Sequence, residues 1–196
     1  MNPTAATTAT AVIATYLDEL RDAMQHTLAQ ELDRTVDLFR DARARGATLF
    51  FCGNGGAAST ASHFACDLGK NTVHPIKGRF RTVALVDNIP AVTAWGNDNG
   101  FDQIFVEQAQ NLLRPGDVLV AISGSGNSPN VLLAADYARS LGCTVIGLIG
   151  FEGGKLKERC DVALVVPGRT IEQAEDGQLI LNHAICTAIR ALDAEA

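Results

Sequence analysis

The sequence contains no apolar run close to the ~20 residues that a membrane-spanning helix needs, so a membrane protein is excluded. Aromatic residues make up only 6% of the 196 residues, too few to expect a module that stacks RNA bases on aromatic side chains. Acidic residues outnumber basic ones by 22 to 16, and the formal net charge is −6. A dedicated nucleic-acid-binding protein normally has a basic excess, so no nucleic-acid partner is expected. No basic segment opens the chain, so a secretory signal is not predicted either.

Cysteine is scattered along the chain and shows no pairing pattern. The cysteines number five, an odd count, and no two of them form a Cys-x-x-Cys pair. This argues against a disulfide framework and a structural zinc knot, and it favours reduced thiols in the cytoplasm. We expect all five to be small core residues: Cys52, Cys66, Cys143, Cys160 and Cys186.

The rest of the composition is that of a globular protein, with 47% hydrophobic and 19% charged residues. Because no internal linker interrupts the chain, we predict one domain over residues 1–196, with residues 1–10 as a disordered end. Over Ala11–Arg45, apolar residues recur every three to four positions, which predicts helix up to Gly46. This stripe is long for one small domain. It indicates either two helices that meet near Thr27–Gln30 or one helix packed against a partner chain, and we interpret it as a helical oligomerisation segment.

Beyond Gly46, short apolar runs alternate with amphipathic segments. This alternation predicts an α/β fold, a three-layer α/β/α sandwich with a five-stranded parallel sheet and helices on both faces. The predicted strands are Thr48–Cys52, Thr82–Val86, Val118–Ile122, Thr144–Ile149 and Val162–Val166. The predicted helices are Ala57–Leu68, Ile89–Trp95, Pro129–Leu141 and about Glu175–Ala191.

Two of the predicted strands run into glycine-rich clusters, Cys52–Gly56 (CGNGG) and Ser123–Ser128 (SGSGNS). In an open α/β sheet, ligands bind outside the carboxyl ends of the strands, so both clusters are expected at one edge facing one ligand. Glycines and a helix start favour an anion, although the first cluster also fits a simple tight turn and lacks the lysine of a P-loop. The second cluster suits a monophosphate, or a turn in which Ser128 is the helix N-cap.

Several titratable residues have a spacing that suggests chemistry. His63 and Asp67 lie four residues apart on one predicted helix, which suits a divalent ion, an acid/base pair or an ordinary surface hydrogen bond. His183 interrupts an apolar stretch of the last helix, so it is a metal or proton-transfer candidate or a hydrogen-bonded core histidine. Asp176 lies on the same side of that helix as His183. Glu175 is turned away by about 80°, so a metal shared with His183 would require a loosened helix entry.

Asn97 and Asp98 lie in the predicted turn Trp95–Gly100. They could accept hydrogen bonds from sugar hydroxyls or shape an Asx turn. His26 and His74 have no supporting context, and we assign them no role.

Taken together, these motifs resemble the sugar isomerase (SIS) fold family and, within it, the phosphoheptose isomerases. The resemblance rests on the long N-terminal helix, CGNGG, the His-x-x-x-acid helix over Ser62–Leu68, Gly-Asn-Asp at Gly96–Asp98, SGSGNS, and the closing helix with His183. It implies a flavodoxin-like sheet and a homotetramer with active sites near subunit boundaries. It also implies an aldose–ketose isomerase that converts D-sedoheptulose 7-phosphate to a D-glycero-D-heptose 7-phosphate.

The resemblance also assigns roles to individual residues. Those that would contact the substrate or its phosphate are Asn54, Gly55, Gly56, Asn97, Asp98, Ser123, Gly124, Ser125, Ser128 and Glu175. A metal site, zinc in some members, would comprise His63, Asp67, Glu175 and His183. The family usually has Glu at position 67, Gln at position 175 and often Ser at position 57, where this chain has Asp, Glu and Ala.

The expected reaction moves hydrogen between C1 and C2 of the sugar through a cis-enediol(ate). It needs a base at carbon, for which we expect Asp67, and a partner for the oxygen-bound protons, for which we expect His183. One zinc ion per subunit and no organic cofactor are expected. Two alternatives stay open, a non-catalytic tetrameric SIS protein that binds the bacterial replication initiator, and a sugar-phosphate sensor.

Overall fold

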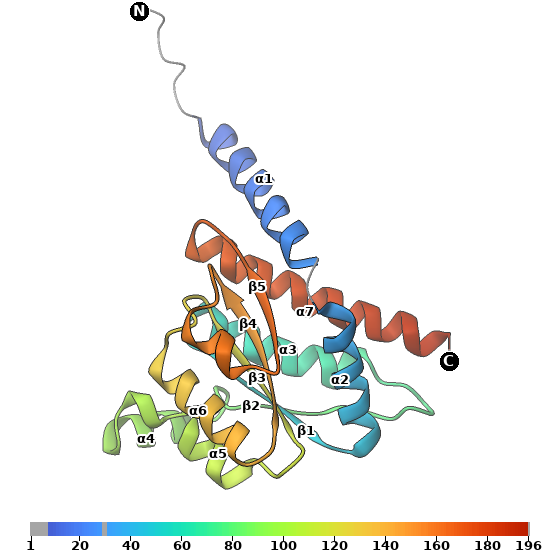
Figure 1. Ribbon diagram of the computed structural model, residues 1–196, viewed down its shortest axis with the longest axis vertical. Helices are drawn as coiled ribbons and strands as arrows, with labels where there is room; N and C mark the ends of the chain where they lie inside the picture. The colour runs from blue at the N-terminus through green and yellow to red at the C-terminus, as the bar shows by residue number, and fades with distance from the viewer. Residues whose placement is uncertain (1–7, 29–30, 196) are drawn as a thin grey trace, which may run out of the picture.

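The five strands of the protein form one parallel sheet in the order β2-β1-β3-β4-β5 (Figure 1). The computed structural model describes residues 8–28 and 31–195. The strands are β1 (Thr48–Cys52), β2 (Arg81–Ala84), β3 (Val118–Ser123), β4 (Thr144–Gly150) and β5 (Val162–Val166). This is the flavodoxin-like order, and the predicted fold class is confirmed. The central strand β3 is buried at all six positions, because helices cover both faces of the sheet.

One face of the sheet is covered by α2 (Leu32–Arg45), α3 (Gly56–Asn71) and α7 (Ile171–Ala194). The ring of Phe64 on α3 lies 5.2 Å from that of Phe51 on β1 and 5.8 Å from that of Phe39 on α2. All three side chains are fully buried, and burying each contributes about 1.5–3 kcal/mol. This aromatic cluster fixes α3 on the sheet and thereby fixes the position of the residues on its outer side.

The other face is covered by α5 (Val106–Leu112) and α6 (Pro129–Ser140), with α4 (Ile89–Asp98) and the short 3₁₀ helices η1 (Phe101–Gln103) and η2 (Gly154–Arg159) beside them. The sheet residues on this side pack against a run of small side chains on α6, which lets this helix lie close to the strands. The elements α5, η1 and η2 were not predicted from the sequence. They are short and have no long periodic pattern.

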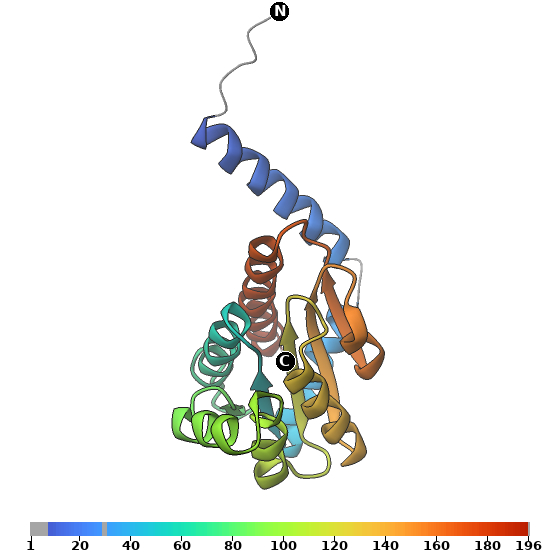
Figure 2. The same ribbon diagram turned by 90° about the vertical axis from the view of Figure 1, so that its left-hand side faces the viewer.

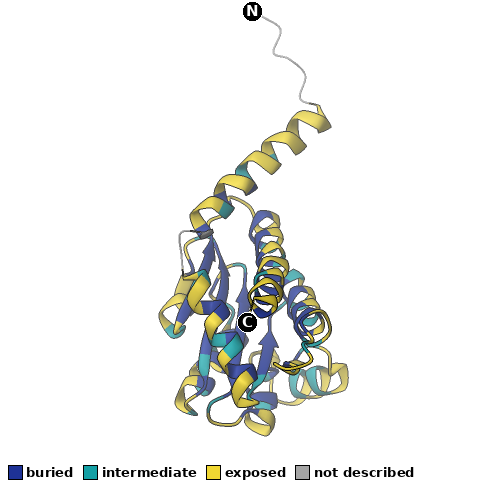
Figure 3. Ribbon diagram, turned by 90° about the vertical axis from the view of Figure 1, so that its right-hand side faces the viewer, coloured by how far each residue is buried: buried dark blue, intermediate teal, exposed yellow. Residues whose placement is uncertain are grey.

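The N-terminal segment forms two helices, α1 (Ala9–Leu28) and α2, as one of the two alternatives predicted. Helix α1 projects from the body of the molecule in both side views (Figures 1 and 2) and is mostly exposed (Figure 3). Its first turn begins at Ala9, earlier than expected, because the Thr8 hydroxyl accepts a hydrogen bond from the Ala11 amide. The predicted disordered end therefore does not include positions 9 and 10, and positions 1–7 lie outside the described residues. The contact to the body includes the hydrogen bond from Thr27 Oγ1 to the Val165 carbonyl.

Helix α7 begins at Ile171, four residues earlier than predicted. The Thr170 side chain accepts from the Gln173 amide, and the Gln173 side chain in turn accepts from the Thr170 amide. This capping box is a strong start signal that was not recognised in the sequence. Glu175 therefore lies inside a regular helix, and the loosened entry considered above does not occur.

A buried ion pair joins α2 to the end of α7. Arg43 contacts both carboxylate oxygens of Asp193, at 2.8 Å and 2.7 Å, and each side chain is only 3% exposed. The Arg43 guanidinium also stacks over the Phe80 ring at 4.7 Å. Burial raises the pKa of Asp193, but the hydrogen bonds and charge of Arg43 outweigh this and keep the pKa below its ordinary value.

All five cysteines are free thiols. Burial raises the pKa of Cys52, Cys160 and Cys186 to about 12, so these side chains stay protonated at neutral pH. Cys52, Cys143 and Cys186 are buried as expected, Cys160 is half-buried, and Cys66 is exposed, which corrects the expectation for that residue. Among the helices of the described residues, none combines the length and the apolar character needed to cross a membrane.

Candidate active site

The two glycine-rich clusters lie at the carboxyl ends of β1 and β3, which are neighbours in the sheet. Helix α3 leaves β1 on one face of the sheet and α6 leaves β3 on the other. This is the topological switch point at which open α/β sheets bind ligands. The structure therefore brings the clusters together as predicted from the strand pattern.

A reciprocal amide pair ties the two clusters to each other. Asn54 Nδ2 donates to Asn130 Oδ1 at 2.8 Å, and Asn130 Nδ2 donates to Asn54 Oδ1 at 3.0 Å. Asn130 is 1% exposed, and its Oδ1 also accepts from the Val131 amide. The pair fixes the first glycine-rich loop relative to the start of α6. Asn130 was not singled out in the sequence, although it lies only two residues after the second cluster.

The serine-rich turn is closed by its own hydroxyls. Ser123 Oγ accepts from the Gly126 amide at 3.1 Å and lies 3.5 Å from Ser128 Oγ, while Ser125 Oγ accepts from the Asn127 amide at 3.2 Å. Ser128 occupies the N-cap position of α6 but makes no capping hydrogen bond with its side chain. Hydroxyl groups and a helix N-terminus thus meet at one point, which suits a phosphate group without a cationic side chain.

His63, Asp67 and His183 converge from two helices. Asp67 Oδ2 lies 3.2 Å from His63 Nε2 and 3.6 Å from His183 Nε2, and the two imidazole nitrogens are 3.3 Å apart. The Asp67 side chain is 12% exposed, whereas the two histidines are about half exposed at 45% and 54%. The cluster therefore has a buried carboxylate at its base and two imidazoles at the surface.

The spacing of these three atoms is compatible with zinc. Bonds of about 2.0–2.1 Å in a tetrahedral site place neighbouring ligand atoms roughly 3.3 Å apart, close to the separations within the cluster. Two imidazoles and one carboxylate are a ligand set that zinc accepts, with a fourth position left for solvent or substrate. Within the described residues, the metal-compatible cluster comprises these three and does not extend to Glu175.

Glu175 instead lies over the first residue of α3. A Cβ atom built on Gly56 would lie 2.6 Å from Glu175 Oε1 and closer still to the rest of the carboxyl group. The carboxylate thus occupies the space that a glycine leaves at a helix N-terminus, where the helix dipole favours negative charge. It faces the CGNGG cluster, on the side of α3 where the helix begins.

Helix α1 contacts the first turns of α7. Tyr16 donates to Asp176 Oδ2 at 2.6 Å, and burial followed by this hydrogen bond raises the pKa of Tyr16 to about 12. Glu19 accepts from Gln173 Nε2 at 2.8 Å and pairs with Arg169. The spacing placed Asp176 on the same side of the helix as His183, and in the structure its carboxylate is hydrogen-bonded to Tyr16 of α1.

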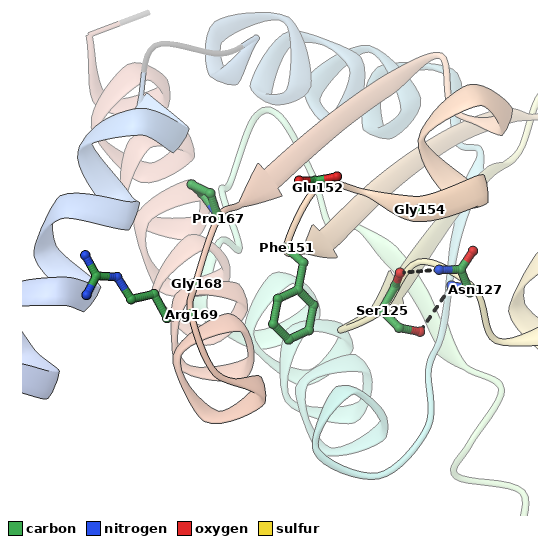
Figure 4. Close-up of a pocket in the computed structure, with 8 residues that line it drawn as sticks. All are labelled: Ser125, Asn127, Phe151, Glu152, Gly154, Pro167, Gly168 and Arg169. Carbon is green, nitrogen blue, oxygen red and sulfur yellow. Dashed lines mark hydrogen bonds between the residues drawn. The ribbon is translucent and has the colours of Figure 1, made fainter.

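A cavity of about 770 Å³ opens over the carboxyl ends of β3, β4 and β5 (Figure 4). Of the predicted site residues only Ser125 lines it, and Phe151 points into it with a positive φ of 53°. A smaller cavity of about 180 Å³ is lined by Asn54 and Gly55. His63, Asp67 and His183 converge with one another and line neither of these two cavities.

Asn97 and Asp98 form the last turn of α4, because this helix runs further than Trp95. Asn97 Nδ2 donates to Asp98 Oδ1 at 2.7 Å, and both side chains are exposed. Among the described residues, no hydrogen bond joins them to either glycine-rich cluster. The predicted turn is therefore wrong up to Asp98, which removes the Asx-turn alternative, and the substrate role of these residues stays a prediction.

Comparisons with known proteins were made against families, curated sequences and solved structures. A family model described as SIS domain matches residues 14–150. The phosphoheptose isomerase of Aliarcobacter butzleri (strain RM4018) is 38% identical over 170 residues, which covers 83% of this chain and 86% of that protein. The solved phosphoheptose isomerase of Neisseria gonorrhoeae is 34% identical with a TM-score of 0.85, covering 94% of this chain and 100% of that one. The enzyme of Francisella tularensis is 28% identical with a TM-score of 0.84, covering 93% and 98%.

Proposed function

The chain belongs to the SIS-domain family and, within it, to the phosphoheptose isomerases, and from this premise we propose that it converts D-sedoheptulose 7-phosphate to a D-glycero-D-heptose 7-phosphate. The reaction is an internal redox exchange, in which C1 of the ketose becomes an aldehyde and the C2 carbonyl becomes an alcohol. No external oxidant or reductant is needed, and therefore no organic redox cofactor. The observation that supports the proposal best is the convergence of Asp67 with two imidazoles.

Asp67 is the proposed base at carbon. Its Oδ2 removes a proton from C1 of the ketose, the electron pair forms the C1–C2 double bond, and the C2 oxygen becomes the oxygen of a cis-enediol(ate). Return of the proton to C2 forms the aldose. His183 gives a proton to the C2 oxygen and takes one from the C1 hydroxyl through an imidazole nitrogen that is not bound to a metal; its Nε2 lies 3.6 Å from the same oxygen of Asp67. Proton transfer at carbon and at oxygen needs one unprotonated group and one protonated group side by side. A carboxylate and an imidazole supply such a pair.

We expect one zinc ion per subunit, held by His63, Asp67 and His183. Glu175 is proposed as a fourth ligand, although its carboxylate does not belong to the cluster of ligand atoms that His63, Asp67 and His183 form. When bound, zinc supplies Lewis-acid stabilisation of negative charge. Its own charge also offsets the cost of burying the Asp67 carboxylate.

The phosphate is proposed to bind at the serine-rich turn, through Ser123, Gly124, Ser125 and Ser128. The sugar then extends toward Asn54, Gly55, Gly56 and the Glu175 carboxylate, with Asn97 and Asp98 as further predicted contacts. Support comes from the hydrogen bonds of the Asn54–Asn130 pair, which hold the two loops in one relative position. A rigid pair of loops orients the substrate at low entropic cost.

We propose that the protein is a homotetramer in the cytoplasm. The apolar side chains Val12, Ile13 and Leu17 on α1 are 54–58% exposed, and a surface stripe of this kind suits a second copy of the chain. The free thiols suit a reducing compartment. Light scattering checks the assembly, and the mass of a single 20.7 kDa chain at micromolar concentration would contradict it.

The function is tested by incubating the protein with sedoheptulose 7-phosphate and recording proton NMR spectra. New anomeric signals of an aldoheptose phosphate are expected, and their couplings identify the epimer. In D₂O, the proton that the base has taken from C1 can exchange with solvent before it is returned to C2. Deuterium is therefore expected at C2 of the product. Asp67→Asn is the matched control, since it keeps the shape of the side chain but removes the base.

The same experiment separates the alternatives. Binding of the sugar phosphate without turnover would indicate a sensor, and absence of both would favour a non-catalytic binding protein. The combined retention of carboxylate and imidazole groups on α3 and α7 supports the enzyme over both.

A further inference from the structure

The two carboxylate oxygens of Asp67 have different surroundings. Oδ1 accepts a hydrogen bond of 2.8 Å from Asn71 Nδ2, one helical turn further along α3. Oδ2 accepts one of 3.4 Å from Asn182 Nδ2 on α7, and it also faces both histidines of the cluster. The carboxylate is thus held by one amide on each oxygen, and only Oδ2 points at the imidazoles.

Asn182 lies in the packed interface between α3 and α7 and is fully buried. A buried amide costs free energy unless its polar atoms find partners. Its Nδ2 faces the Asp67 carboxylate, which can only accept, and its Oδ1 accepts from Cys186 Sγ at 3.7 Å. An apolar side chain would fill this interface at lower cost. The position of the amide is therefore explained by the carboxylate it contacts.

We propose that Asn71 and Asn182 are positioning residues that hold the Asp67 side chain in one orientation, so that Oδ2 is the oxygen that serves as base and metal ligand. Asn71 donates a hydrogen bond to Oδ1, so this oxygen is directed away from the imidazoles. Asn182 fixes the rotation of the carboxylate from the opposite helix. This inference rests on the proposed isomerase function and deepens it, because it assigns the reacting atom within Asp67.

The central test compares Asn182→Leu with Gln178→Leu. Gln178 lies one turn earlier on α7, is also fully buried, and donates to the Leu148 carbonyl instead of to Asp67. Both variants replace a buried amide by an apolar side chain of similar size. We expect Asn182→Leu alone to lower kcat 10- to 100-fold with KM within about twofold, since outer partners of site ligands typically have effects of this size.

Zinc binding gives a second readout that does not depend on turnover. Protein stripped of metal is titrated with zinc against a chromophoric chelator, and Asn182→Leu is expected to bind zinc 10- to 100-fold more weakly than the wild type or Gln178→Leu. Asn71→Leu is expected to act in the same direction. Asn71→Gln is expected to recover most of the loss, because Asn71 is exposed and a longer amide can still reach Oδ1. If Asn182→Leu does not fold, the Asn71 pair decides the question.

The outcomes separate this inference from the function it rests on. Wild-type turnover together with unchanged kcat and zinc affinity in Asn182→Leu and Asn71→Leu overturns the positioning role and leaves the isomerase intact. Equal losses in Gln178→Leu also overturn it, because general loosening of α7 would then explain the effect. If the wild type shows no turnover, the proposed function fails, and the zinc titration alone supports or overturns the role of the two amides.

Discussion

Replacing Gly56 by alanine provides a sharp test of where Glu175 acts. The new Cβ would lie 2.6 Å from Glu175 Oε1, whereas ordinary contacts begin at 3.4 Å, so the carboxylate must retreat by roughly 1 Å. A displacement of this size at a substrate-contacting group costs about 10²-fold in rate, or about 2.7 kcal/mol of transition-state stabilisation. The fold should tolerate the change, because the obstacle is the end of a flexible side chain and Gly→Ala at a compatible position stabilises by about 0.4–1 kcal/mol.

The assay measures kcat/KM for sedoheptulose 7-phosphate beside the free energy of unfolding. Gly46→Ala is the matched control, because Gly46 ends α2 with a φ of 71° and has no atom within 4 Å of its would-be Cβ. It should lose about 1 kcal/mol of stability and keep full activity. In a Glu175→Ala background, Gly56→Ala should have no further effect on rate. Wild-type activity of Gly56→Ala, or an undiminished loss in that background, would refute the reasoning.

Three further results are expected. Asp193→Asn should destabilise the protein by about 3–5 kcal/mol in urea unfolding, because it leaves the Arg43 guanidinium buried without its counter-charge. In the wild type this contribution is fully present above about pH 4 and is lost as the pH falls through the lowered pKa of Asp193. A free energy of unfolding that does not change with pH in this range would contradict the pairing. One thiol should react fast with Ellman's reagent in the native protein, and this fast reaction should be absent in Cys66→Ser. Several fast-reacting thiols in that variant would show that the buried cysteines are accessible to the reagent. Ser125→Ala and Ser128→Ala should each raise KM with little change in kcat, because each removes one hydrogen bond to a charged group, worth about 1.5–3 kcal/mol. An unchanged KM in both variants would remove the phosphate assignment.

The parts of the fold that could be predicted are those with strong periodic or compositional signals. The sheet was predicted from the apolar runs of β1, β3 and β5. The glycine-rich clusters that follow β1 and β3 were predicted to meet at one edge of it, and they do. The start of α7 was missed because its signal is two residues, Thr170 and Gln173, that cap the helix reciprocally. Helix α5 was missed because seven residues give too little periodicity to identify a helix.

The candidate site was predictable as a set of residue types but not as a set of contacts. The i, i+4 spacing of His63 and Asp67 predicted one shared face. The resemblance put His183 in the same set, and the structure shows its contact with them from a helix more than 100 positions later. Asn182 had a signal, since a polar pair within an apolar stretch requires partners, but its partner is on another helix. The position of Glu175 over Gly56 depends on how α7 packs against α3, which no local pattern encodes.

In the proposed homotetramer, the contacts of α1 with α7 would link quaternary structure to the surroundings of Glu175. Tyr16 and Glu19 brace the turns on either side of Glu175, and the exposed apolar stripe of the same helix is where a neighbouring subunit would bind. If a neighbouring subunit covers that stripe, its release exposes the stripe to water and leaves α1 held against α7 by its own hydrogen bonds alone, while the sheet and the serine-rich turn stay formed. On the proposed homotetramer, dilution is then expected to lower the activity per subunit before it unfolds any strand.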